Sequence, residues 1–86
     1  MVAVTLYTKP TCPYCIGAKQ LLDSKGISYT DINITSISDE ERNALSQKTD
    51  GYRTVPQIFI GETFVGGFDQ LNQLNRQGKL DDMLSA

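Results

Sequence analysis

Histidine is absent from this chain of 86 residues, and cysteine occurs only twice. A structural zinc ion needs four ligands, so a complete site within one chain would have to include carboxylates. The other way to complete such a site is to share the ion between two copies of the chain. The sequence therefore predicts no metal site, and it leaves no imidazole to move protons during a reaction.

Long apolar segments and an excess of one charge are also missing. No run reaches the length needed to cross a membrane, and the apolar stretch at residues 2–7 is too short for a signal peptide. Eight basic and ten acidic residues give a net charge of −2, which argues against nucleic acid or an acidic membrane surface as a partner. No linker, repeat or low-complexity segment divides the chain. We therefore expect one domain spanning residues 1–86, with a single modest core.

Both cysteines lie in one tetrad, Cys12-Pro13-Tyr14-Cys15, which follows a strand-forming run and opens a predicted helix. Two thiols one helical turn apart can close into a disulfide and open again with little strain. A permanent structural disulfide is a poorer interpretation, because it would close a very short loop and restrain the unfolded chain little. An ordinary pair of core cysteines would not need a proline at the first helical position. The tetrad therefore predicts redox chemistry, and cycling thiols without a signal peptide favour a reducing cytosol.

The position of Cys12 indicates how the two thiols divide the work. Cys12 falls at the predicted N-cap and Pro13 at the first helical position, so unpaired N–H groups and the positive end of the helix dipole would face the Cys12 sulfur. Lys9, three residues upstream, adds a nearby cation. We therefore expect Cys12 to be the attacking thiolate at neutral pH, and Cys15 to stay a thiol until it resolves the mixed disulfide.

The remaining patterns predict a small α/β fold. Strand-forming runs, the last two joined by a tight hairpin at Gly61-Glu62, predict strands over residues 2–7, 27–34, 57–60 and 63–65. Helical spacing and cap residues predict helices over residues 13–25, 38–48 and 68–77, with a short closing turn near residues 80–84. The order β-α-β-α-β-β-α predicts a four-stranded mixed sheet with helices on both faces and a right-handed crossover between its first two strands.

Four segments of the sequence, taken together and in order, point to a known family. They are Tyr-Thr-Lys at residues 7–9, Cys-Pro-Tyr-Cys at 12–15, Thr-Val-Pro at 54–56 and Gly-Gly-Phe-Asp at 66–69. The chain resembles the glutaredoxins of the dithiol type, within the thioredoxin-fold group, over essentially its whole length. The resemblance implies a thioredoxin-like fold, a cis Val55–Pro56 bond and glutathione as the co-substrate.

The resemblance also implies a glutathione site, although its charged residues have plainer interpretations. Lys9, helped by Arg53, would bind the glycine carboxylate, but Lys9 could equally be a solvated turn residue. Backbone N–H groups of Phe68 and Asp69 would bind the other carboxylate, and the Asp69 side chain would bind the ammonium, although an acid there also stabilises a helix start. The other implied residues flank the reacting sulfur or present their backbone to the bound peptide: Tyr14, Thr54, Val55, Pro56 and Gly67.

The sequence departs from the common family pattern at two positions of this site. Phe68 stands where cysteine or serine is frequent, and Gln70 stands where a second acid is frequent, which puts the strength of ammonium binding in doubt. No residue of the second helix clearly corresponds to a contact with the glycine carboxylate, and Arg42 and Asn43 are candidates. Without the resemblance, Pro56 could be an ordinary loop proline.

The residues and the resemblance together predict an enzyme, a glutathione-disulfide oxidoreductase. Its partners would be glutathione, glutathionylated proteins and disulfide-containing proteins, and it would act as a monomer without a metal. Two other functions remain open. A redoxin that depends on thioredoxin reductase would use the same dithiol without a glutathione site. An iron–sulfur carrier would hold a cluster between two copies through Cys12 and bound glutathione, although Pro13 and Cys15 count against it.

Overall fold

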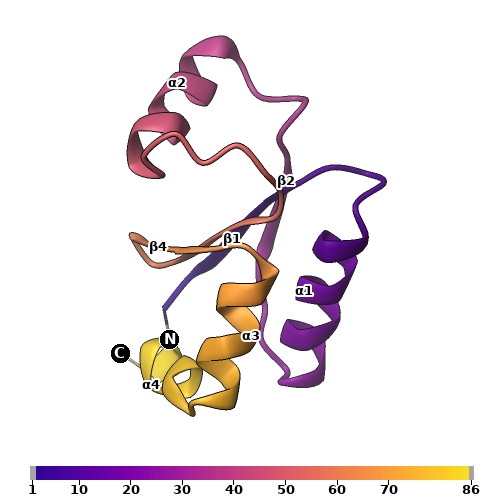
Figure 1. The fold of residues 1–86 in the computed structure, drawn as a ribbon, viewed down its shortest axis with the longest axis vertical. Coiled ribbons are helices and arrows are strands. Elements are labelled where there is room, and N and C mark those ends of the chain that lie inside the picture. Colours follow the sequence, from indigo (N-terminus) through magenta and orange to yellow (C-terminus); the bar gives the residue numbers. More distant parts are fainter. Residues whose placement is uncertain (1, 86) are drawn as a thin grey trace.

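The computed structural model describes residues 2–85, which form a four-stranded sheet and four helices (Figure 1). In chain order the elements are β1 (Val4–Thr8), α1 (Pro13–Ser24), β2 (Thr30–Asn33), α2 (Asp39–Lys48), β3 (Gln57–Ile60), β4 (Thr63–Gly66), α3 (Phe68–Arg76) and α4 (Lys79–Ser85). The strand order is β2-β1-β3-β4. β1 runs parallel to β2 and antiparallel to β3, and β3 pairs antiparallel with β4. The predicted four-stranded mixed sheet is confirmed.

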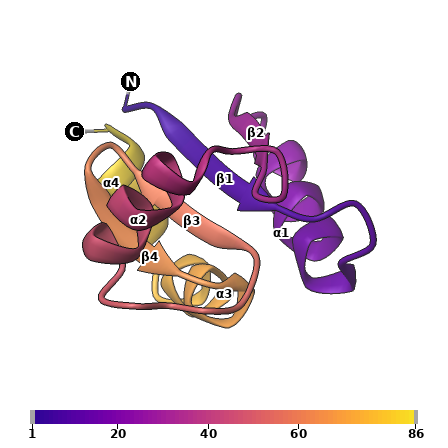
Figure 2. The same cartoon turned by 90° about the horizontal axis from the view of Figure 1, so that it is seen from above.

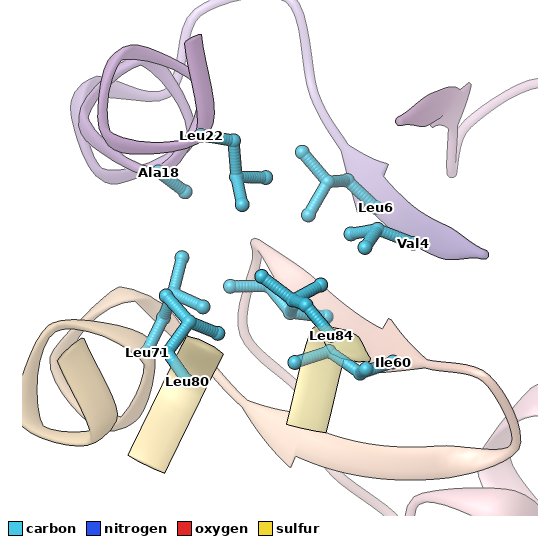
Figure 3. Packing of buried hydrophobic residues seen from close by; sticks show 9 residues of the cluster. Val4, Leu6, Ala18, Leu22, Ile60, Leu71, Leu80 and Leu84 are labelled. Carbon is cyan, nitrogen blue, oxygen red and sulfur yellow. The ribbon is translucent and has the colours of Figure 1, made fainter. Parts of the chain in front are cut away.

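Helices cover both faces of the sheet, as predicted. α1, α3 and α4 lie on one side and α2 lies on the other (Figures 1 and 2). Because successive strand residues point to opposite faces, Leu6 of β1 enters the core on the first side, whereas Tyr7 packs with Phe59 under α2. The larger core lies between the sheet and the three helices of the first side (Figure 3) and contains Val4, Leu6, Ala18, Leu22, Ile58, Ile60, Leu71, Leu80 and Leu84.

The first crossover differs from the prediction in the length of its second strand. We expected a strand over residues 27–34, but β2 pairs with β1 only from Thr30 onward. The backbone N–H of Ile27 instead donates to the Leu22 carbonyl at 3.0 Å, and Gly26 adopts a left-handed backbone with φ +70°. These contacts are typical of a helix C-terminus. Ile27 therefore belongs to the turn that ends α1.

The C-terminal segment, predicted as a short closing turn, forms the helix α4. Leu80 and Leu84 are four residues apart and therefore lie on one face of a helix, and both are buried in the larger core (Figure 3). The Lys25 ammonium contacts the Asp81 carboxylate at 3.1 Å, which links the end of α1 to α4. The prediction of a turn was wrong, because it overlooked the helical spacing of these two leucines.

The strand pairing brings three loops together at one edge of the sheet. Tyr7, near the end of β1, pairs with Gln57 at the start of β3, because the two strands are antiparallel. Gly66, at the end of β4, pairs with Ile58. The loop after β1, the loop before β3 and the start of α3 therefore meet at the same place. None of the helices within residues 2–85 is long and apolar enough to span a membrane.

Candidate active site

The two thiols lie where the loop after β1 enters α1. Cys12 is the N-cap residue, with an extended backbone, and Pro13 is the first residue of the helix. The backbone N–H of Cys15 donates to the Cys12 Sγ at 3.1 Å, so an amide of the first helical turn faces this sulfur as predicted. Such N–H groups stabilise an anion at a helix start. Both cysteines are free, which is the dithiol state.

The two sulfurs have different surroundings. Cys12 retains 8% of its surface exposed and Cys15 only 1%, so an incoming disulfide can reach Cys12 far more easily. Burial, together with a hydrogen bond to Cys12, raises the pKa of Cys15 to about 11, and a hydrogen bond from the Lys9 backbone acts in the other direction. Cys15 is therefore a thiol at neutral pH in the dithiol state, in agreement with the expectation from its place in the helix.

The loop before β3 lies against the Cys12 sulfur. The Cys12 thiol donates a weak hydrogen bond to the Val55 carbonyl, with 3.7 Å between sulfur and oxygen. The Val55–Pro56 peptide bond is cis, as the resemblance implied. Pro56 is buried, whereas Thr54 is exposed. An extended peptide joined to Cys12 would therefore run past the backbone of residues 54–56.

A groove with a volume of about 560 Å³ lies beside Cys12. All nine residues that the sequence assigned to glutathione binding line it, and two further residues, Tyr52 and Gln70, complete the wall. The lining comes from the three loops that meet at this edge of the sheet. Residues that are up to 60 positions apart in the sequence thus share one surface: Lys9, Tyr14, Arg53, Thr54, Val55, Pro56, Gly67, Phe68 and Asp69.

The groove carries charge of both signs. Lys9, Arg53 and Asp69 are exposed, and within the part of the chain that the structure describes none of the three forms an ion pair. Their charges are therefore available to a ligand that carries both carboxylates and an ammonium. Tyr14, with 62% of its surface exposed, adds an aromatic ring next to the sulfur.

The start of α3 forms one end of the groove. A Cβ atom on Gly67 would lie 2.8 Å from the Tyr52 hydroxyl, so a larger residue here would have to displace the end of the Tyr52 side chain. The Gln70 side-chain oxygen accepts from the Gly67 N–H at 2.9 Å. Phe68 and Asp69 begin the helix, where the first backbone N–H groups have no partner within the helix. Gln70 thus stabilises the helix start at the position where the family often has a second acid.

Sequence reasoning missed Tyr52. Its ring packs edge to face on Phe64, with ring centroids 5.1 Å apart, and its hydroxyl reaches over Gly67. This neighbourhood joins the loop before β3 to the end of β4, and nothing in the local sequence signals it. The two candidates on the second helix do not line the groove: Arg42 donates to the Ile34 carbonyl at 3.1 Å, and Asn43 is exposed on α2.

The fold and the site together define a class of protein. A mixed sheet of this order, with a dithiol at the start of the first helix and a cis proline beside it, is that of a thioredoxin-fold thiol–disulfide oxidoreductase. The family model for glutaredoxin matches residues 4–65. The chain belongs to the glutaredoxin family.

Individual relatives agree with this assignment. A glutaredoxin of Pseudomonas aeruginosa is 52% identical over 86 residues, which is the full length of both chains. The solved buckwheat glutaredoxin–glutathione complex is 38% identical with a TM-score of 0.85, covering 98% of this chain and 77% of the buckwheat chain. A structure described as "Metal Binding of Glutaredoxins" is 46% identical with a TM-score of 0.74, covering 98% and 89% of the two chains. Among residues 2–85, no cluster of three or more cysteine, aspartate or glutamate side chains is placed to hold a metal ion.

Proposed function

We propose that this chain is a glutathione-dependent oxidoreductase that reduces glutathione mixed disulfides and protein disulfides. The observation that carries the proposal is the groove beside Cys12, which is lined by exposed basic and acidic side chains, those of Lys9, Arg53 and Asp69. Glutathione has two carboxylates and one ammonium, so Lys9 and Arg53 would bind its glycine carboxylate. The start of α3 would bind the second carboxylate, and Asp69 would bind the ammonium. The buckwheat relative supports this proposal, because that protein was solved as a glutathione complex.

In the proposed reaction Cys12 attacks first. Its thiolate forms a bond to the glutathione sulfur of a mixed disulfide, and the substrate thiolate leaves. A second glutathione thiolate then attacks the glutathione sulfur bound to Cys12, so that oxidised glutathione leaves and Cys12 returns to the thiolate. With a protein disulfide, Cys12 forms the mixed disulfide and Cys15 displaces the protein thiol. Because the chain has no histidine, the leaving thiolate would take its proton from water or from the Cys15 thiol, or would have a pKa low enough to leave without one.

The same proposal includes the setting in which the protein acts. Residues 1–86 would work as one domain and as a monomer, in a reducing cytosol where glutathione is abundant. Neither nucleic acid nor a membrane surface would be a partner, given the net charge of −2.

The proposal predicts that the groove selects glutathione disulfide over a neutral disulfide. The Cys15→Ser protein, which cannot resolve, should form a single glutathione adduct on Cys12. For each disulfide, the rate of adduct formation on Cys12 is divided by the rate at which a small free thiol reacts with the same disulfide. This ratio should be about ten-fold or more higher for glutathione disulfide than for 2-hydroxyethyl disulfide, because each charge-assisted contact contributes roughly 1.5–3 kcal/mol. Intact-mass measurements over time, with peptide mapping of the adduct, give both rates. Equal ratios for the two disulfides would refute a glutathione site.

A further inference from the structure

A second, smaller cavity lies next to the resolving cysteine. Its volume is about 200 Å³, and of its lining residues only Lys9 is shared with the glutathione groove. Cys15, Lys19 and Asp31 all line this cavity. Cys15 and Lys19 are four residues apart on α1, so both lie on the same face of the helix. The cavity therefore joins a buried thiol to a charged pair that has no part in the glutathione site.

Two strands hold the Lys19 ammonium in place. Lys19 Nζ contacts Asp31 Oδ2 of β2 at 2.5 Å, and the Thr8 hydroxyl of β1 donates to Asp31 Oδ1 at 2.5 Å. Thr8 is buried, with 3% of its surface exposed. The aspartate thus has its two oxygens engaged by groups from two elements, and it fixes the ammonium beside the cavity. Besides Asp31, the titratable neighbours of Lys19 are Tyr29 and Cys15, and Asp23 lies beside Tyr29.

The charges of this pair persist over a wide pH range. The hydrogen bond to Asp31 raises the pKa of Lys19 and outweighs the opposing effect of burial. Burial acts to raise the pKa of Asp31, but the hydrogen bonds from Lys19 and Thr8 outweigh it and hold that pKa below its usual value. The raised pKa of Lys19 therefore keeps its side chain cationic at neutral and mildly alkaline pH.

Cys15 needs such a cation at one step of the reaction. It must become a thiolate to attack, yet its burial and its contacts with Cys12 raise its pKa. Once Cys12 is in a mixed disulfide, its sulfur can carry no negative charge. Of the groups that face Cys15, the Lys9 backbone N–H favours the thiolate more strongly, and the Lys19 ammonium adds a smaller electrostatic contribution in the same direction.

We propose that Lys19, fixed by Asp31 and Thr8, is a positioning residue for the resolving step, where its ammonium favours the thiolate of Cys15. This inference rests on the proposed role of Cys15. In the step, Cys15 loses its proton to solvent through the cavity. Its sulfur then bonds to the Cys12 sulfur and breaks the bond to the substrate sulfur. The substrate thiolate leaves with the electron pair of that bond and takes up a proton from water, so the Cys12–Cys15 disulfide forms as the substrate is reduced.

Stopped-flow kinetics with one equivalent of 5,5′-dithiobis(2-nitrobenzoate) separate the two steps. The first thionitrobenzoate released reports the attack by Cys12, and the second reports resolution by Cys15. In Lys19→Met the second rate should fall by about three- to ten-fold between pH 7 and 9, the range for loss of one partly screened unit charge. The first rate should change little, and Lys19→Arg should restore the second.

Lys25→Met is the matched control, because it also removes one lysine charge from an ion pair. Lys25 lies at the C-terminal end of α1 and pairs with Asp81. It should leave both rates at the parent value, and Lys19→Gln repeats the test if Lys19→Met unfolds. A second rate equal to the parent in the Lys19 variants would overturn the proposal. An equal fall in both rates, or a Lys19→Arg protein as slow as Lys19→Met, would also overturn it. The assay contains no glutathione, so it tests the inference independently of the glutathione site.

Discussion

Cys12→Ser is expected to abolish every thiol–disulfide exchange, whereas Cys15→Ser should lose only part of the activity. Cys12 carries the accessible sulfur, and an amide N–H of α1 faces it. Cys15 is buried and is a thiol at neutral pH. A Cys15→Ser protein should therefore still reduce glutathione mixed disulfides, because a second glutathione can release the product. It should fail on protein disulfides that require a resolving thiol.

Steady-state assays of both variants on the two kinds of substrate check this division. The substrates are a glutathionylated peptide and a protein with a single accessible disulfide, and unfolding midpoints show that the variants are folded. Cys12→Ser should not exceed the rate without protein on either substrate. Equal losses for both variants on the glutathionylated peptide would mean that the two cysteines act as one unit, contrary to the proposal.

Asp69→Ala should have the second largest effect, chiefly on the KM for glutathionylated substrate. The carboxylate is exposed at the first turn of α3 and lines the groove, where it would pair with the ammonium of glutathione. One charge-assisted contact contributes roughly 1.5–3 kcal/mol when shielded. Because Asp69 is exposed, we expect a value at the lower end, which is about ten-fold in kcat/KM. The sulfur geometry is untouched, so kcat should change less.

Asp82→Ala is a suitable control, because it removes an exposed acid from the first turn of another helix, α4. Asp82 does not line the groove. Its kinetics should match the parent. Gln70 cannot mask the loss at Asp69, because its oxygen is engaged by the Gly67 N–H and its side chain carries no charge. Parent-like kinetics for Asp69→Ala would return this residue to a purely structural role at the helix start.

The sequence predicted the elements whose signals are local. The burial of Cys15, Ala18 and Leu22 along α1 follows from their helical spacing, and the Ser38 hydroxyl caps α2 by accepting from the Glu41 N–H. The predicted limits of β2 were wrong, because the N–H of Ile27 donates to the Leu22 carbonyl in the turn after α1. Turn hydrogen bonds of this kind compete with strand pairing, and residue pattern alone does not show which will form.

Most of the candidate site was predicted as well, because the four matching segments contain eight of its lining residues and Arg53 directly precedes one of them. The contacts that the sequence did not reveal join residues from different elements of the fold. Tyr52 reaches Gly67 only because β3 and β4 form a hairpin, and Asp31 reaches Lys19 only because β2 lies parallel to β1. Contacts of this kind depend on strand register and side-chain direction, which a single sequence does not specify.

Under the proposed function, glutathione bound in the groove beside Cys12 is the reductant of this dithiol. A coupled assay tests it directly, with one glutathionylated substrate, NADPH and either glutathione plus glutathione reductase or thioredoxin reductase alone. We expect NADPH oxidation that depends on this protein and on glutathione in the first mixture, and only background oxidation in the second. Protein-dependent oxidation with thioredoxin reductase alone, and none with glutathione and its reductase, would contradict the account.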